Sequence, residues 1–297
     1  MINKQELLKF IEENPKLVKI RPSVRYPELS VVKYTRKVFY DALWNDILEE
    51  CRGLVLNKNM DPVIVPFKKI YNRGENNTDF PLDEKVTMVR KVNGFMAAAT
   101  FVEEVNDVVI STTGSLDSDF VTLAEKWLRP SIVPAIKKHG HGITWLFEIC
   151  DPSDPHIIEE LPGPYLIGAR TVLRGSMFLE KDLDYFCTQQ FAAMRPNHLS
   201  NISFGTVVEL AKKVQHEGFV VHGKDKSLKI KTPFYLFSKF IARCSADKFE
   251  DIMDGKYDQT IDEEFYPLLD HLRKKRDLVV LLDEQPRLDY IRKFYYE

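Results

Sequence analysis

Apolar residues recur with two different spacings along this chain, and each spacing predicts a different kind of element. Alternation with a period of two, or a short continuous apolar run, is typical of a β-strand, whereas a period near 3.6 is typical of a helix. Strands are predicted at residues 49–57, 63–72, 86–89, 95–102, 142–150, 165–170, 217–221 and 227–231. Helices are predicted at residues 5–13, 120–128, 204–214, 234–241 and 266–272. The pattern indicates a mixed α and β region followed, after Lys231, by helices.

Length and composition indicate a globular chain. It has 297 residues, of which 44% are hydrophobic, and this is enough to bury a core in one large domain and a smaller one. Apolar runs such as residues 278–282 are far shorter than the ~20 residues that span a bilayer. Residues 1–6 are polar and lack the apolar core of a signal peptide. We therefore expect a soluble cytoplasmic protein without a membrane partner.

Cysteine spacing and net charge exclude several classes of protein. Cys51, Cys150, Cys187 and Cys244 are far apart and form no C-x-x-C pair, so neither a zinc ribbon nor a disulfide framework is indicated. We expect reduced thiols. The formal net charge of −2 argues against a protein that coats nucleic acid by bulk charge, and it leaves local basic patches as candidates.

One such patch is the segment of residues 16–37. It contains seven Lys and Arg residues and the single acid Glu28, interleaved with Tyr26 and Tyr34. Basic residues beside aromatic residues suit a nucleic-acid backbone with stacked bases. A solvated edge strand protected by lysines explains the same composition equally well.

The stretch from Arg90 to Phe95 places a lone lysine, Lys91, between two predicted strands, with Gly94 three residues later. A lysine at such a turn is positioned to act as a covalent nucleophile, and a glycine lets the backbone approach a phosphate or a base. The tetrapeptide of residues 91–94 also arises by chance, and an ordinary surface lysine before a turn fits it. The interpretation therefore depends on what lies downstream.

Two acidic residues occur in or at the start of apolar strands. Glu148 lies within the predicted strand 142–150, and Glu217 opens the strand 217–221. Because burial of an unpaired carboxylate is costly, each should be paired or should bind a metal ion. A buried salt bridge to Lys229 or Lys231 is the alternative for Glu217. Lys229 and Lys231 are two residues apart in a strand, so they face the same side.

Two upstream cations and one turn add candidates for anion binding. Arg52 and Lys69 are expected on two strands that carry them toward the approach to Lys91. The turn of residues 111–115 is rich in hydroxyls and backbone N–H groups, which hold anions. A plain loop before a helix that begins near Ser118 or Asp119 explains this turn as well.

Four segments that carry these residues follow one another in a set order. They are Lys91-Val92-Asn93-Gly94, Phe147-Glu148-Ile149, Glu217-Gly218-Phe219-Val220-Val221 and Leu228-Lys229-Ile230-Lys231. Together they resemble motifs I, III, IV and V of the covalent nucleotidyltransferases, which include the ATP-dependent DNA and RNA ligases and the mRNA capping enzymes. Upstream, residues 50–53 and 69–75 look most like the phage RNA ligases of the tRNA-repair class. The resemblance covers roughly residues 40–240.

The chain departs from the superfamily at identifiable places. DNA ligases and capping enzymes usually carry an arginine two residues after the motif I glycine, where this chain has Met96. No run of strands like an OB-fold follows Lys231, and the R-x-D-K type motif of those enzymes is missing. The tRNA-repair class can place a lysine before the glycine of the turn 111–115, where this chain has Thr113, so a phosphate contact there is in doubt.

The resemblance implies an α+β fold, with an antiparallel-sheet nucleotidyltransferase (adenylyltransferase) domain at residues 1–231 and a small all-helical C-terminal module at residues 232–297. It implies ATP and Mg²⁺ (or Mn²⁺) as cofactors. Lys91 would be the nucleophile, and the catalytic cations Lys229 and Lys231 would favour its neutral amine. Glu148 and Glu217 would be the metal ligands. The implied cofactor-binding residues are Arg52, Lys69, Lys91, Gly94, Glu148, Glu217, Lys229 and Lys231.

The same resemblance implies an ATP-dependent RNA ligase that joins RNA 5′-phosphate and 3′-hydroxyl ends through a lysyl-AMP and an RNA-adenylate, in RNA or tRNA repair. Its partners would be RNA ends, including those of a nicked tRNA anticodon loop, and an end-healing kinase/phosphatase. Two other classes stay open: an ATP-dependent DNA ligase or mRNA capping guanylyltransferase, and a non-catalytic RNA-binding protein on a ligase fold. A covalent adduct with one labelled nucleotide distinguishes them.

The tail after Lys231 has 11 basic and 14 acidic residues, which makes it a poor non-specific RNA clamp. We expect it to dock on the catalytic domain and to recognise RNA shape through a few placed side chains. Residues 273–276 form a basic cluster that is a candidate phosphate contact, although a solvated helix end explains it too.

Overall fold

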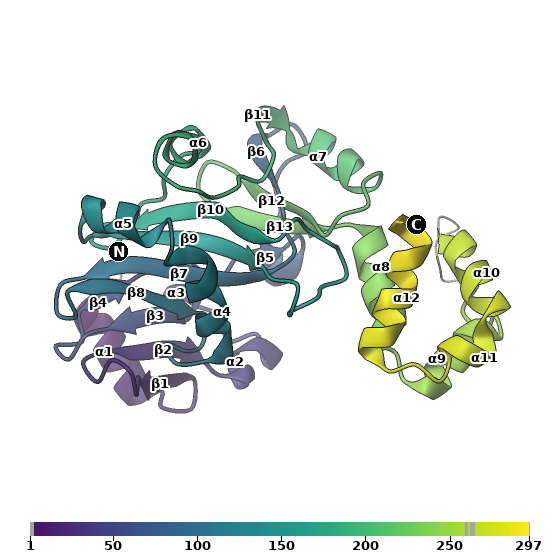
Figure 1. The fold of residues 1–297 in the computed structure, drawn as a ribbon, viewed down its shortest axis with the longest axis horizontal. Coiled ribbons are helices and arrows are strands. Elements are labelled where there is room, and N and C mark those ends of the chain that lie inside the picture. The colour runs from purple at the N-terminus through teal and green to yellow at the C-terminus, as the bar shows by residue number, and fades with distance from the viewer. Residues whose placement is uncertain (1–2, 259–260, 262–264, 297) are drawn as a thin grey trace. The chain divides into compact units, whose positions relative to one another are not determined.

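The structure, a computed structural model, describes residues 3–258, 261 and 265–296. Contacts between Cα atoms divide the chain into two compact units (Figure 1). Unit 1 contains Met1–Asp79, Gly94–Asp154 and Leu161–His198. Unit 2 contains Phe80–Asn93, Pro155–Glu160 and Leu199–Glu297. The chain therefore passes between the units directly after the stretch that holds Lys91.

Unit 1 contains two antiparallel sheets and the helices that cover them. Its strands are β1 (Val18–Pro22), β2 (Ser30–Tyr34), β3 (Arg52–Leu56), β4 (Pro62–Ile64), β5 (Tyr71–Asn72), β7 (Phe95–Val102), β8 (Asp107–Thr112), β9 (Ile143–Cys150) and β10 (Gly163–Thr171). Its helices are α1 (Lys4–Glu13), α2 (Arg36–Tyr40), α3 (Asp46–Glu50), η1 (Glu75–Asn77), α4 (Asp119–Leu128), α5 (Val133–His139) and α6 (Glu180–Gln189). One sheet has the order β1-β2-β3-β4 and the other the order β10-β9-β7-β8.

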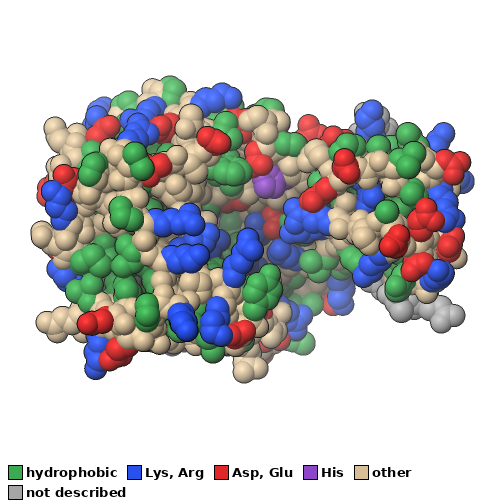
Figure 2. All heavy atoms as spheres, turned by 90° about the horizontal axis from the view of Figure 1, so that it is seen from below, with side chains coloured by type: hydrophobic (Ala, Val, Ile, Leu, Met, Phe, Trp, Pro, Cys, Tyr) green, Lys and Arg blue, Asp and Glu red, His purple; other side chains and the backbone are tan. Residues whose placement is uncertain are grey.

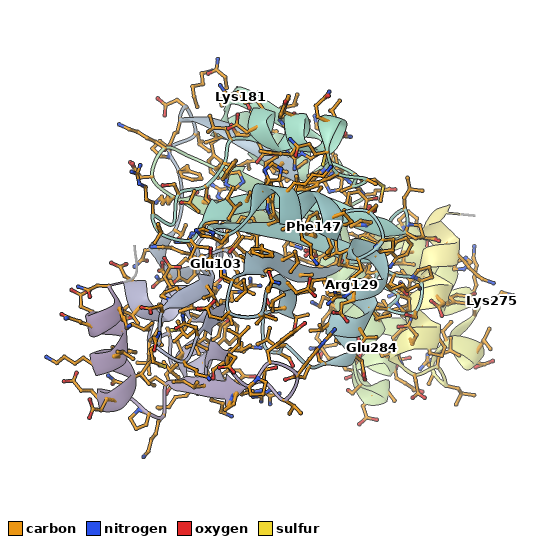
Figure 3. All side chains as sticks on the ribbon, turned by 60° about the vertical axis from the view of Figure 1, so that its left-hand side comes forward. Glu103, Arg129, Phe147, Lys181, Lys275 and Glu284 are labelled. Atoms are coloured by element: carbon orange, nitrogen blue, oxygen red, sulfur yellow. The ribbon has the colours of Figure 1, made fainter. Side chains whose placement is uncertain are left out.

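The alternation of apolar residues explains how these sheets pack. Val31 and Val55 of the first sheet share one apolar cluster with Ala98 and Leu146 of the second, so the two sheets bury these faces against each other. The opposite face of the first sheet packs on α1, α2 and α3. The opposite face of the second sheet packs on α4, α5 and α6, with Phe147 of β9 at the centre of unit 1 (Figure 3). Strand β9 is thus buried on both sides.

Unit 2 begins with an antiparallel sheet. Its strands are β6 (Lys85–Arg90), β11 (His198–Ser203), β12 (Gly218–His222) and β13 (Ser227–Lys231), in the order β11-β6-β12-β13. Helix α7 (Phe204–Ala211) covers one face, where Phe219, Val221, Leu228 and Ile230 form an apolar cluster with Phe204. The alternating burial of β13 turns Leu228 and Ile230 into this cluster and turns Lys229 and Lys231 to the other face.

After Lys231 the described residues form helices. They are α8 (Pro233–Arg243), α9 (Ala246–Met253), α10 (Tyr266–Lys274), α11 (Arg276–Val279) and α12 (Glu284–Tyr296). Helices α8 and α12 lie side by side (Figure 1). Phe237, Ile241 and Phe249 share their apolar core with Ile157 and Ile158, so this core also holds residues from the middle of the chain.

The structure confirms the predicted α+β class, and it corrects two predicted strands. The strand expected at residues 49–57 begins only at Arg52, because Asn45 caps the short helix α3 by accepting the backbone N–H of Leu48 at 2.8 Å. The strand expected at residues 63–72 is broken into β4 and β5. Pro66 lies in the gap and has no N–H to donate to a strand ladder.

The four cysteines are free thiols, as expected, and burial raises the pKa of Cys51 to about 12. Within the described ranges, the helices are too short or too polar for any of them to cross a bilayer.

Candidate active site

Lys91 directly follows β6 and lies in line with two residues of the neighbouring strands. Its backbone N–H donates to the carbonyl oxygen of Gly218 at 2.8 Å. Gly218 in turn pairs with Lys231 across β12 and β13. The sheet of unit 2 therefore places Lys91 and Lys231 on either side of a residue that has no side chain.

Gly218 is required at this position by both its conformation and its surroundings. Its φ is +143°, a region that residues with a Cβ rarely adopt. A Cβ built on Gly218 would lie 1.9 Å from the carbonyl oxygen of Ile230, which is far inside contact distance. The glycine thus allows β12 and β13 to approach at the row that holds Lys91 and Lys231.

Glu217 is the carboxylate that meets this row. It is buried, with 4% of its surface exposed, and its Oε2 accepts a hydrogen bond from Lys91 Nζ at 2.7 Å. Its Oε1 lies 4.0 Å from Lys231 Nζ. The Asn93 amide, oriented so that its oxygen accepts the Ile158 N–H at 3.1 Å, donates to Glu217 Oε2 at 3.2 Å. Glu217 is thus paired with Lys91 and also with Lys231, one of the two salt-bridge partners predicted from the sequence.

A second carboxylate, Glu160, fixes the backbone around Lys91. Its side chain is 4% exposed and accepts from Arg90 Nη2 at 2.8 Å, while its Oε1 accepts the Asn93 N–H at 3.3 Å. Arg90 and Asn93 flank the lysine in the chain. Sequence reasoning missed Glu160, because it lies in a segment without periodicity and only the fold brings residues 155–160 to this place.

A further cation that the sequence did not single out is Lys239 of α8. Lys239 and Lys231 both approach the ring of Tyr235, with Lys231 Nζ at 5.3 Å and Lys239 Nζ at 5.6 Å from the ring centroid. Burial lowers the pKa of Lys239, the charges of Lys231 and Arg243 lower it further, and Glu217 opposes them. The first tail helix therefore contributes charge to the cluster that contains Lys91.

In unit 1, Glu148 lies on β9 and turns to the backbone of motif I. It is 8% exposed, and its Oε1 accepts the Gly94 N–H at 3.2 Å. A Cβ on Gly94 would lie 2.3 Å from the carbonyl oxygen of Ile149, so the predicted close approach at this glycine is to β9 itself.

Arg52 lies on the same side of unit 1 as Glu148. Met96 pairs with Glu148 between β7 and β9, and Arg52 Nη1 approaches Met96 Sδ at 3.9 Å. Arg52 also continues a row of cations, because Lys19 pairs with Lys33 and Lys33 with Arg52 across β1, β2 and β3. Burial lowers the pKa of Lys33, and Arg52 and Arg21 add to the effect. Figure 2 shows Lys and Arg side chains gathered on one face of unit 1.

Lys69 has a different setting from the one predicted. It lies in the loop between β4 and β5, not on a strand, and its side chain is 8% exposed. Its Nζ donates to Glu75 Oε1 at 2.7 Å and lies 4.5 Å from the Tyr71 ring centroid and 5.3 Å from that of Trp44. Lys69 is thus held in an aromatic and acidic enclosure of unit 1.

The basic cluster predicted at residues 273–276 is partly occupied inside unit 2. Arg273 donates to the carbonyl oxygens of Met253 at 3.1 Å and Ile252 at 3.0 Å. Arg276 pairs with Asp254 at 2.6 Å and Glu250 at 3.1 Å. Both arginines therefore stabilise the packing of α9 against the helices that follow it.

Comparisons with known proteins identify the family and the fold. A family model described as RNA ligase matches residues 50–240. An archaeal ATP-dependent RNA ligase (form 1) shares the fold with a TM-score of 0.61 and 13% identity, over 94% of this chain and 78% of that one. A putative ATP-dependent DNA ligase from Aquifex aeolicus has a TM-score of 0.58 and 15% identity, over 98% of this chain and 75% of that one. These two likenesses show a common fold.

A Naegleria gruberi RNA ligase with PPi is matched over 52% of this chain with a TM-score of 0.45 and 15% identity, and this chain spans only 51% of it. None of the curated proteins matches the chain in sequence. Because the RNA ligase model covers more than half of the sequence, including all four motifs, the chain belongs to the RNA ligase family.

Proposed function

We propose that this chain is an ATP-dependent RNA ligase that joins a 5′-phosphate to a 3′-hydroxyl through a covalent AMP on Lys91. The observation that carries the proposal is the placement of Lys91 in unit 2, where Glu217 Oε2 lies 2.7 Å from its Nζ and Lys231 lies in the same row. A lysine, a buried carboxylate and a second cation at this spacing supply a nucleophile, a proton acceptor and a phosphate ligand.

In the first step Lys91 Nζ attacks the α-phosphorus of ATP. The bond from Nζ to phosphorus forms, the bond from the α-phosphorus to the bridging oxygen breaks, and pyrophosphate leaves. The attacking nitrogen must lose its protons, and Glu217 Oε2 is the acceptor at hydrogen-bond distance. Glu217 thus holds the Lys91 side chain in position and accepts a proton from it, which frees the nitrogen lone pair for the attack; the second proton leaves as the N–P bond forms.

The cations of unit 2 would stabilise the charge of the phosphates. Lys231 and Lys229 project from the same face of β13, as the sequence predicted, and Lys231 faces Lys91 across Gly218. Fixed cations at a site of phosphoryl transfer stabilise the transition state electrostatically. For Arg52 of unit 1 we propose contact with the β- and γ-phosphates and later with the RNA 5′-phosphate. The ion pair of Lys69 with Glu75 makes Lys69 the weaker candidate for that role.

Mg²⁺ or Mn²⁺ fits the chemistry of the carboxylates. Among the described residues there is no group of three or more His, Cys, Asp or Glu side chains that could hold a metal ion. Mg²⁺ is commonly held by one or two carboxylates together with substrate phosphates and waters, and Glu148 and Glu217 each offer one. When bound, such an ion would neutralise phosphate charge.

The second and third steps complete the joining reaction. An RNA 5′-phosphate oxygen attacks the phosphorus of the lysyl-AMP and releases the Lys91 amine. A 3′-hydroxyl then attacks the 5′-phosphorus of the RNA-adenylate, and AMP leaves. The row of Lys19, Lys33 and Arg52 supports a role with RNA, because such a row can track a phosphate backbone. We propose a broken RNA, such as a nicked tRNA anticodon loop with ends prepared by a healing kinase/phosphatase, as the natural substrate.

The test is to incubate the chain with 5′-phosphorylated RNA or DNA strands, ATP and Mg²⁺, and to follow joined products on a denaturing gel. We expect RNA strands to be joined only when ATP and the metal are both present. Preferential joining of DNA would favour the DNA ligase alternative, and an adduct formed from GTP alone would favour the capping enzyme. A chain that binds RNA without any nucleotide adduct would be a non-catalytic binding protein.

A further inference from the structure

One face of α8 combines exposed apolar side chains with basic ones. Leu236, Lys239, Phe240 and Arg243 follow the spacing i, i+3, i+4 and i+7, so they lie on one side of the helix. Leu236 is 51% and Phe240 39% exposed, which is unusual for apolar residues of a helix that already buries its other side in a core. This stripe is therefore not explained by packing within unit 2.

The stripe lines a pocket in unit 2. The start of α9, including Lys248, completes the pocket, whose volume is about 430 Å³. This size falls in the range of roughly 300–1,000 Å³ that is typical of sites for small ligands. Lys239, Arg243 and Lys248 supply three cations, and none of the residues that line the pocket in the described part of the chain is acidic. The pocket thus suits an anionic ligand with an apolar or aromatic part.

The cations and rings of this region alternate from the sheet to the pocket. Lys231 and Lys239 both face the ring of Tyr235, and Lys248 Nζ lies 4.7 Å from the centroid of Phe240. Proteins bind single-stranded nucleic acid with basic residues beside exposed rings, because bases stack on the rings while the cations hold phosphates. Tyr235 is only 6% exposed, so Phe240 is the ring of this line on which a base can stack. Lys239 connects the two groups of residues, since it faces Tyr235 and also lines the pocket.

We propose that this pocket binds one nucleotide of the single-stranded RNA end, with its base against Phe240 and its phosphate held by Lys239, Arg243 and Lys248. The proposal rests on the proposed function and deepens it, because it places the RNA strand on the first two helices of the tail. A nucleotide within a strand has a base for the exposed ring of Phe240 and a backbone phosphate for the cations.

Lys248 and Phe240 are the residues that test this proposal most cleanly. Arg243 already pairs with Glu284 of α12 (labelled in Figure 3), and Lys239 also faces the Lys91 cluster, so changes at either have a second consequence. Lys248 is exposed on the first turns of α9, and its Nζ contacts only rings in the described contacts of its side chain. Its removal should leave the helix intact.

The experiment measures binding of a 5′-phosphorylated single-stranded RNA by Lys248→Ala at several salt concentrations, without ATP. We expect the affinity to fall about threefold to tenfold, and the slope of log K against log salt to become shallower by about 0.7, which is one phosphate contact. Lys213→Ala is the matched control, because Lys213 is an exposed lysine just after α7 and outside the pocket. The control should bind with the affinity and slope of the unchanged chain.

A second arm tests the base. We expect the unchanged chain to prefer RNA over an abasic strand of equal length, and Phe240→Ala to lose about fivefold or more in affinity for RNA and most of that preference. Melting temperatures check that each variant is folded. If Lys248→Ala and Phe240→Ala bind RNA as Lys213→Ala does, the proposal is wrong.

The outcomes separate this proposal from the proposed function. If Lys248→Ala slows formation of lysyl-AMP in the absence of RNA, the pocket serves the triphosphate and the proposal is overturned. If the unchanged chain forms no lysyl-AMP at all, the ligase function fails, while the RNA-binding comparison of Lys248→Ala with Lys213→Ala can still be made and can still succeed.

Discussion

Glu217 Oε2 lies 2.7 Å from Lys91 Nζ, although the two residues are 126 positions apart in the sequence. The pairing arises because β12, which begins at Gly218, pairs with β6, which ends just before Lys91. The carbonyl oxygen of Gly218 accepts the Lys91 backbone N–H at 2.8 Å. A buried carboxylate at hydrogen-bond distance holds the lysine side chain in one orientation. It also provides the nearest place for the proton that the nucleophile has to lose.

Glu217→Gln should slow the formation of lysyl-AMP by about 10²- to 10⁴-fold, which is the usual contribution of a positioned proton acceptor. Glutamine keeps the size of the side chain and can still accept a hydrogen bond, but it cannot take up the proton. Single-turnover adenylation with labelled ATP measures the effect. Glu159→Gln, at an exposed residue of unit 2, is the control and should adenylate at the normal rate. A Glu217→Gln variant as fast as this control would remove Glu217 from the chemistry.

Gly218→Ala should destabilise unit 2 by at least about 2 kcal/mol, because it adds backbone strain and a clash. The new Cβ would lie 1.9 Å from a backbone oxygen, which cannot move without parting β12 from β13. Gly255→Ala is the comparison: its φ of +80° is also positive but less restrictive for a residue with a Cβ, and the nearest atom is the end of the Asp258 side chain at 3.1 Å. Urea unfolding should show a clearly larger loss for Gly218→Ala, and equal losses would mean that the strand contact is not tight.

The stability of unit 2 should fall as the pH is lowered from about 6.5 to about 4, because of His216. Burial lowers the pKa of His216 to about 4, and the Arg90 charge contributes, while the Glu217 charge opposes the shift. The Gly218 N–H donates to Nδ1 at 3.1 Å, which requires this nitrogen to be unprotonated. In that pH range the unfolded chain binds a proton that the folded chain does not, so protonation favours unfolding.

His216→Asn tests this origin. Asparagine can accept the Gly218 N–H through its side-chain oxygen, but it does not titrate. We expect the melting temperature of the variant to drop less between pH 7 and pH 5 than that of the unchanged chain. An identical drop in both would assign the acid sensitivity to other groups.

The sequence predicted most of the sheet strands because their apolar alternation is strong. Strands 95–102 and 227–231 were predicted with the limits observed for β7 and β13. The errors at residues 49–57 and 63–72 arose where a local signal opposed the pattern: an asparagine cap at Asn45 and a proline at Pro66. Helices such as α9 and α12 were missed, because their apolar residues are few or alternate with charged ones. These helices are stabilised by packing in the core of unit 2.

The sequence could predict the candidate site only at residues that lie in recognisable motifs. The lysines of β13 share one face as expected, because strand geometry decides that from spacing alone. The pairing of Lys91 with Glu217 and the contacts of Glu160 and Lys239 could not be predicted, because they join segments that are distant in sequence. The roles assigned to the site residues all stay predictions, as does the domain boundary after Lys231; these residues are Arg52, Lys69, Lys91, Gly94, Glu148, Glu217, Lys229 and Lys231.

The central claim is that Lys91 carries the AMP. The direct measurement is to incubate the unchanged chain and Lys91→Ala with ATP and Mg²⁺, digest both, and locate the adenylated peptide by mass spectrometry. We expect the adduct on Lys91 in the unchanged chain, none in Lys91→Ala, and continued sealing by Lys91→Ala of RNA that is already 5′-adenylated. A normal amount of adduct in Lys91→Ala, or an adduct on another lysine of the unchanged chain, would contradict the account.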